Sequence, residues 1–139
     1  MGRVFPKALN AAAVTPDDWI EILRLCDKFT IDLMPVIAHG LAPKAVEDVS
    51  DKDVAWLLAI TIKFRSHFPR AFMDGLFCRL TDHKRRLGVA EARILGAELL
   101  LSVAECREFL VINGIVETGS RAFHASRYLD TYLKSTARG

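Results

Sequence analysis

Basic side chains are concentrated in one short segment, which is the part of the sequence best suited to binding an anion. It contains Arg79, His83, Lys84, Arg85 and Arg86. Arginine and lysine bind phosphate and carboxylate groups through charge-assisted hydrogen bonds. We therefore predict that these residues form a surface for an anionic partner, either nucleic acid or an acidic protein. The alternative is a solvated helix end, where cations offset the negative end of the helix dipole.

A second group of basic residues lies near the end of the chain, beside a turn signal at Thr118–Arg121. The segment around this turn fits a short β-hairpin near residues 115–124. A hairpin beside a helix–turn–helix forms a wing, and residues of a wing contact DNA phosphates. The predicted phosphate contacts are Arg121, His124 and Arg127.

Two stretches of the sequence could form the helix–turn–helix itself. One is Asp82–Ala97, and the other consists of the helices expected on either side of Ser102. The candidate recognition helices carry acidic residues, which are Glu91, Glu98, Glu105 and Glu108. Carboxylates are repelled by DNA phosphates, so DNA binding is the alternative to the function that we favour.

The residue patterns of common catalytic and metal sites are missing from the sequence. It has no glycine-rich phosphate loop, no His-Glu-x-x-His and no Gly-x-Ser-x-Gly. No histidine is three or four residues from another histidine or from a cysteine, as metal ligands on one helix face would be. We therefore expect no enzymatic activity, no cofactor and no metal site.

The three cysteines, Cys26, Cys78 and Cys106, are an odd number and lie among apolar residues. Their spacing fits neither a disulfide framework nor a zinc site. We interpret them as buried free thiols in a reducing compartment, which predicts a cytoplasmic protein.

Neither a membrane segment nor a targeting signal is expected. The longest uncharged apolar run, Val54–Ile62, has nine residues, whereas a membrane-spanning helix needs about 20. The N-terminal segment is basic, but no apolar stretch long enough for a signal peptide follows it. We interpret residues 1–14 as a flexible arm and residues 15–139 as one domain, because the length of 139 residues suits a single domain.

Helical periodicity predicts an all-α, single-domain compact bundle of five to six helices, in addition to the short hairpin. Thr15 and Pro16 start the first helix, and Pro35 ends or kinks it. The second helix is capped by Ser50 and extends to about Phe68. This helix is apolar on nearly every side, so we expect it at the centre of the bundle.

The later helices are expected to pack against the central one. The third begins at Pro69 and ends with the basic segment. Its predicted core face is Phe72, Met73, Leu76, Phe77, Leu80 and Leu87. The fourth and fifth meet at Ser102, unless one helix continues through it, and Asn113 ends the fifth. The sixth covers residues 120–136, and Ala125, Tyr128, Leu129, Tyr132 and Leu133 lie on one face of it.

Apolar residues outside the predicted core faces favour contacts with other chains. They are Phe5, Ile20, Ile31, Phe68, Phe109, Tyr128 and Tyr132. The mean hydropathy of +0.20 is high for a monomer of this size. We therefore expect a small non-enzymatic cytosolic adaptor or regulatory protein that acts through protein–protein contacts and forms a homodimer. The alternative is a helix–turn–helix or winged-helix DNA-binding transcriptional regulator.

Overall fold

The computed structural model describes residues 15–29, 34–41 and 46–137. These residues form six α-helices and one 3₁₀-helix, and no β-strand occurs among them: α2 (Pro16–Phe29), α3 (Met34–Leu41), η1 (Val46–Asp48), α4 (Asp51–Lys63), α5 (Arg70–Leu80), α6 (Val89–Ile112) and α7 (Thr118–Ala137). The predicted all-α bundle of five to six helices is confirmed. The predicted arm, which includes Phe5, lies outside the described residues, as does Ile31.

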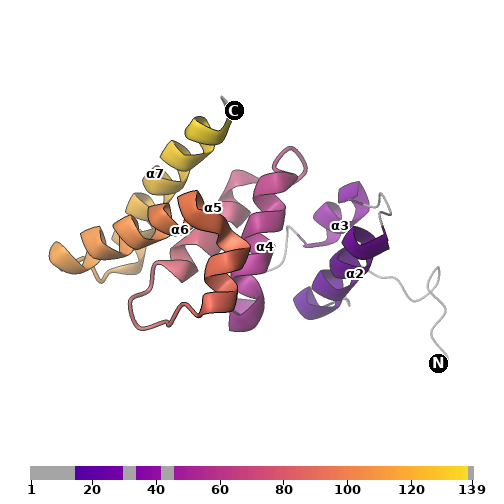
Figure 1. Ribbon diagram of the computed structural model, residues 1–139, viewed down its shortest axis with the longest axis horizontal. Coiled ribbons are helices and arrows are strands. Elements are labelled where there is room, and N and C mark those ends of the chain that lie inside the picture. Colours follow the sequence, from indigo (N-terminus) through magenta and orange to yellow (C-terminus); the bar gives the residue numbers. More distant parts are fainter. Residues whose placement is uncertain (1–14, 30–33, 42–45, 138–139) are drawn as a thin grey trace.

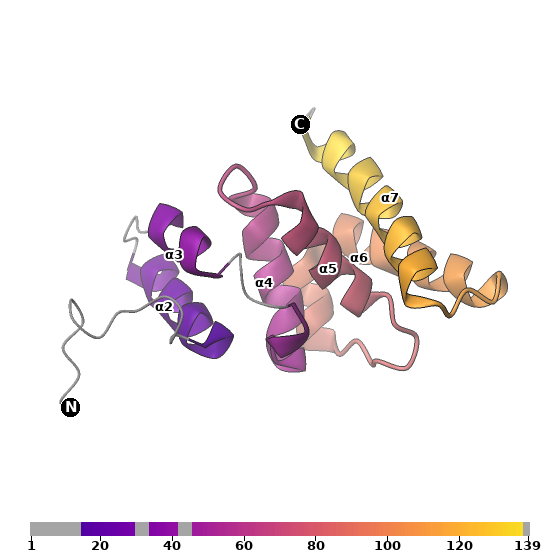
Figure 2. The same ribbon diagram turned by 180° about the vertical axis from the view of Figure 1, so that it is seen from behind.

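The helices fall into two groups along the chain (Figure 1). α2 and α3 pack against each other at one end, and α4, α5, α6 and α7 form the larger group. α5 and α6 each contact both α4 and α7. From behind, α7 and α5 are near the viewer and α6 lies on the far side (Figure 2). Buried apolar residues from both groups form one core.

The first predicted helix is two helices in the structure. α2 begins as predicted, because the Asp18 N–H donates to Thr15 Oγ1 at 3.2 Å. It ends at Phe29, and Pro35 lies in the first turn of α3 instead of ending a helix. Proline is compatible with that turn because the first N–H groups of a helix have no partner within it.

α3 approaches α2 closely because it carries a glycine at the contact. A Cβ atom added to Gly40 would lie 2.1 Å from Cζ2 of the buried Trp19. That separation is too short for any side chain. Close packing against Trp19 therefore explains the glycine at this position.

Polar contacts also connect α2 to α4. Arg24 Nη2 donates to Oδ1 of the buried Asp53 at 2.6 Å, and the guanidinium lies 4.9 Å from the ring centroid of Trp56. The Ser50 hydroxyl donates to Asp17 Oδ1 at 3.0 Å, so Ser50 holds the N-cap position without capping α4 through its side chain. Ser50 therefore contributes to this connection and not to the predicted capping box.

α4 is the central helix of the larger group, as its composition predicts. Its buried residues are Asp53, Val54, Ala55, Leu57, Leu58, Ile60, Thr61 and Ile62. The helix ends at Lys63, five residues before the predicted end at Phe68.

α5 ends earlier than predicted, and this changes the interpretation of the basic segment. The core residues Phe72, Met73, Leu76, Phe77 and Leu80 are buried as predicted. The helix stops at Leu80, so Leu87 and the basic residues His83–Arg86 belong to the loop 81–88. Within this loop the Lys84 N–H donates to Asp82 Oδ1 at 3.0 Å. The proposed role of these cations at a helix end is therefore wrong.

α6 continues through Ser102 and is interrupted at Gly96 instead. Gly96 has a φ of 80° and a ψ of 164°, which glycine adopts without the strain that a side chain would cause. The helix ends where predicted, because the Ile115 N–H donates to Leu110 O at 2.9 Å in a Schellman motif.

Neither predicted helix–turn–helix forms. No turn divides α6 at Ser102. The loop 81–88 that separates α5 from α6 has eight residues, whereas the motif has a turn of about 3–4 residues.

The predicted β-hairpin near 115–124 is also wrong, because α7 begins at Thr118. The Arg121 N–H donates to Glu117 O at 2.9 Å, which is a helical bond. The residues of the turn signal therefore form the first turn of α7. Ala125 and Leu129, on the face predicted for this helix, are buried.

Several residues interpreted as contacts with other chains belong to the core. Ile20 and Phe68 are buried, while Phe109, Tyr128 and Tyr132 are partly buried against the core. The core faces predicted from the sequence were too narrow to include these residues. α2 and α7 each bury side chains over a wider arc than one stripe.

Candidate functional site

An open cleft of about 1180 Å³ contains most of the predicted anion-binding residues. Its walls come from η1, the start of α4, one side of α5, the loop 81–88 and the first turns of α6 and α7. Arg79, Lys84, Arg85 and Arg86 line this cleft, and Arg121 joins them from α7. The structure thus brings one of the predicted wing residues next to the basic segment.

Arg79 holds η1 and α4 in place instead of facing a partner. Arg79 Nη1 donates to Val46 O at 2.8 Å and also to Val49 O. Arg79 Nη2 forms an ion pair with Asp51 at the start of α4. Arg79 therefore connects α5 to η1, to the residue that follows η1 and to the start of α4.

Arg85 holds the start of α6 and is largely buried. Its side chain is 12 % exposed, and Nη2 donates to Glu91 Oε2 at 2.7 Å and to Asp51 O. Glu91 accepts at its other oxygen from the Gly88 N–H at 3.2 Å, at the N-terminus of α6. Arg85 therefore joins the starts of α4 and α6.

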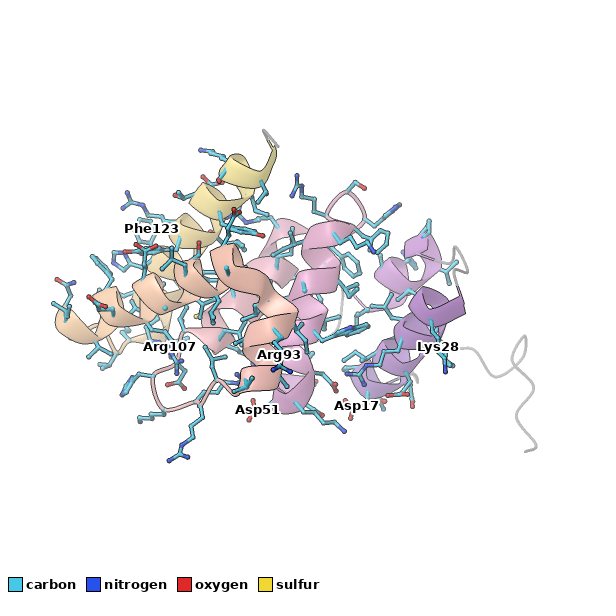
Figure 3. All side chains as sticks on the ribbon, in the orientation of Figure 1. Asp17, Lys28, Asp51, Arg93, Arg107 and Phe123 are labelled. Carbon is cyan, nitrogen blue, oxygen red and sulfur yellow. The ribbon has the colours of Figure 1, made fainter. Side chains whose placement is uncertain are left out.

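Arg107 has a similar role, which was not predicted from the sequence. Its Nη2 donates to Asp82 O at 2.7 Å and to Arg85 O, so it fixes the loop 81–88 against α6 (Figure 3). Burial, followed by the nearby Arg85 charge, lowers the pKa of Arg107. One signal was available, because Arg107 lies four residues after Val103 and three before Leu110, both core residues of α6. We refer to Arg79, Arg85 and Arg107 as the structural arginines.

A second set of cations on the cleft has no such role. Lys52, Lys84, Arg86 and Arg121 line the cleft, and their side chains make no hydrogen bond or ion pair to another described residue. Lys52, Lys84 and Arg86 are exposed and Arg121 is partly exposed. We refer to these four residues as the cleft cations.

The remaining predicted site residues do not line this cleft, although Lys84 and Arg121 also line the smaller cleft that contains His83. His83 lines a smaller cleft of about 330 Å³ beside the C-terminal end of α6. The His124 ring lies 4.9 Å from the ring of Phe109, and the Arg127 guanidinium lies 5.8 Å from the ring of Phe123. His124 and Arg127 are thus placed on the surface of α7 without joining the basic segment.

The cysteines of the cleft region are weak nucleophiles at neutral pH. Cys78 lines the cleft, and burial raises its pKa although Arg121 acts in the opposite direction. Burial and the neighbouring Cys78 raise the pKa of Cys106 to about 12. Within the described residues, no group of three histidine, cysteine or carboxylate side chains could hold a metal ion. The cationic side chains on the lining are groups that can bind an anion.

Across residues 15–29, 34–41 and 46–137, every helix is too short or too polar to cross a membrane. Comparison with known proteins gives no further indication, because no family model, curated protein or solved structure matches this chain.

Proposed function

We propose that the protein is a small non-enzymatic adaptor or regulatory protein that acts through protein–protein contacts and self-associates through the outer side of α6. The observation that carries this proposal is a set of exposed aliphatic side chains on that helix. Its three free cysteines suit a reducing compartment, and we propose the cytoplasm.

The side of α6 that faces away from the core is largely apolar. The buried residues of α6 are Leu95, Leu99, Val103, Cys106 and Leu110. At about 100° per residue, the opposite side carries Ala97, Leu101, Ala104, Glu108 and Ile112, which we call the outer face. All five are exposed, and Leu101 and Ile112 are 59 % and 72 % exposed. No other helix lies in front of α6 in Figure 1.

Contact with another protein would remove these aliphatic side chains from water. Complete burial of a leucine or isoleucine contributes about 1.5–3 kcal/mol. Val116, which follows α6, and Phe123, in α7, are also exposed apolar residues, at 79 % and 59 %. An apolar centre within a polar rim is the usual composition of a protein interface.

A second copy of the chain is the partner that we favour for the outer face. Ala97 and Ala104 are small, so two helices can approach each other closely there. Glu98 and Glu105 are exposed beside the face and would stay in water at the rim. Glu108 lies within the face, so dimerisation brings like charges together, and salt should strengthen it by screening their repulsion.

Sedimentation velocity of two matched variants tests this proposal. Leu101→Asp places a charge on the outer face, while Leu25→Asp changes a similarly exposed leucine on α2, 53 % exposed. We expect dimers for the wild type and for Leu25→Asp, and a 15.5 kDa monomer for Leu101→Asp. Dimerisation of Leu101→Asp, or equal loss of the dimer in both variants, would contradict the proposal.

DNA binding, the alternative from the sequence, lacks the elements that it required. The basic residues His83–Arg86 lie in the loop 81–88 and not on a helix. The outer side of α6 carries Glu98, Glu105 and Glu108.

A further inference from the structure

The cleft contains cations that the fold does not use. The structural arginines Arg79 and Arg85 also line it, but both already form ion pairs with carboxylates. The cleft cations have no such partners among the described residues. An unpaired cation on a surface is ordinary, but four on the lining of one cleft produce a local positive field.

The acidic residues of the lining do not cancel this field. Asp51 and Glu91 pair with the structural arginines, and the Asp82 carboxylate accepts the Lys84 N–H. That N–H is neutral, so Asp82 keeps its charge. Glu47 and Asp82 are thus the two acidic residues of the lining that have no ion pair among the described residues, against four cleft cations.

The N-terminus of α7 adds to the positive potential of the cleft. Thr118, Arg121 and Ala122 from the first turns of α7 line it, and the first turn of this 20-residue helix contains no acidic residue. The N–H groups of a first turn lack acceptors within the helix and point toward an anion. Arg121 therefore lies where the helix itself favours negative charge.

From these observations we infer that the cleft binds the terminal phosphate group of a ligand, held by Lys84, Arg86 and Arg121. A terminal phosphate group carries a charge near −2 at neutral pH and accepts several hydrogen bonds. The cleft volume of about 1180 Å³ leaves space for the body of the ligand, and the lining there is small at Ala71, Gly75 and Ala122. The inference is independent of the outer face of α6, so each can fail without the other.

Calorimetric titration of the full chain tests the inference with three probes. ADP represents a small organic phosphate, and a phosphoserine peptide represents a phosphorylated protein. A short oligothymidylate represents nucleic acid. We expect saturable binding of ADP or the phosphopeptide at one site per chain, and whichever binds identifies the source of the phosphate.

Two triple variants with the same change of charge separate the cleft from general electrostatic attraction. In one variant Lys84, Arg86 and Arg121 are replaced by Gln; Lys52 is kept because it also affects the dipole of α4. The control replaces Lys63, Arg93 and Arg127, which do not line the cleft, by Gln. We expect the cleft variant to bind ADP or the phosphopeptide at least about tenfold more weakly, because the loss of one charged hydrogen bond weakens binding by about that factor. The control should retain the wild-type affinity.

An NMR titration of the wild type gives a readout that does not depend on the folding of a variant. The amide signals of 84–88 and 118–121 should shift with ADP or with the phosphopeptide, and those of α2 should not. Three results would overturn the inference: no binding tighter than about 1 mM by ADP or the peptide, equal losses in both triple variants, or tightest binding by the oligothymidylate.

Discussion

Arg85 and Arg86 are adjacent in the sequence, but the structure gives them opposite roles, and replacement by Gln separates these roles. Arg85→Gln removes the ion pair with Glu91 and the hydrogen bond to Asp51 O. The Glu91 carboxylate, which is only 19 % exposed, would then have lost its cation. Arg86→Gln removes the same charge from an exposed side chain that forms no ion pair among the described residues.

The expected loss for Arg85→Gln follows from the burial of the pair. Breaking a fully buried ion pair costs about 3–5 kcal/mol, and side chains that are 12 % and 19 % exposed fall somewhat below that range. We therefore expect the free energy of unfolding to fall by about 2–4 kcal/mol and the Tm to fall by about 10 °C. Arg86→Gln should change stability by less than about 0.5 kcal/mol.

Urea unfolding followed by far-UV circular dichroism measures both variants under the same conditions. A double-mutant cycle with Glu91→Gln should give a coupling energy above about 1 kcal/mol. If Arg85→Gln and Arg86→Gln unfold at the same urea concentration, or if the coupling energy is zero, the division between structural arginines and cleft cations is incorrect.

Three further expectations concern the core. Gly40→Ala should destabilise the protein by about 1–3 kcal/mol through overlap with Trp19, measured as a lower Tm, and an unchanged Tm would show that α3 does not pack as described. Trp56→Ala should cost about 2 kcal/mol in urea unfolding, below the value for a fully buried tryptophan, because this ring is half-buried under Arg24. With its pKa raised to about 12, Cys106 should stay unreactive toward a thiol reagent at pH 8 until the protein is unfolded. Because the folded pKa exceeds the unfolded one, Cys106 contributes stability below about pH 9 that is lost as the pH rises toward 12.

The sequence was sufficient to predict features that depend on local pattern. Apolar spacing identified the buried faces of α5 and α7, and an apolar helix on nearly all sides identified α4 as central. Thr15 marks the start of α2 and Gly114 follows the end of α6. The hydrogen bonds that cap these two helix ends join residues no more than five positions apart. Such features need no information about the rest of the chain.

The features that could not be predicted depend on partners distant in the sequence. Arg85 and Arg86 have the same local context, and only Asp51, which is 34 residues away, and Glu91 distinguish them. Arg121 joins the basic segment because α7 packs on α5, which no local pattern indicates. Pro35 is compatible both with the end of one helix and with the start of the next, so its place in α3 could not be read from the sequence.

The dependence of self-association on salt tests most directly the claim that the protein acts through the outer face of α6. Sedimentation equilibrium of the wild type at about 0.05 M and about 0.5 M NaCl would report the dimer affinity when charges are weakly and strongly screened. Contact through an apolar face that carries Glu108 on both copies should tighten as salt is added. A monomer at every protein concentration, or a dimer that dissociates as salt is added, would contradict the account.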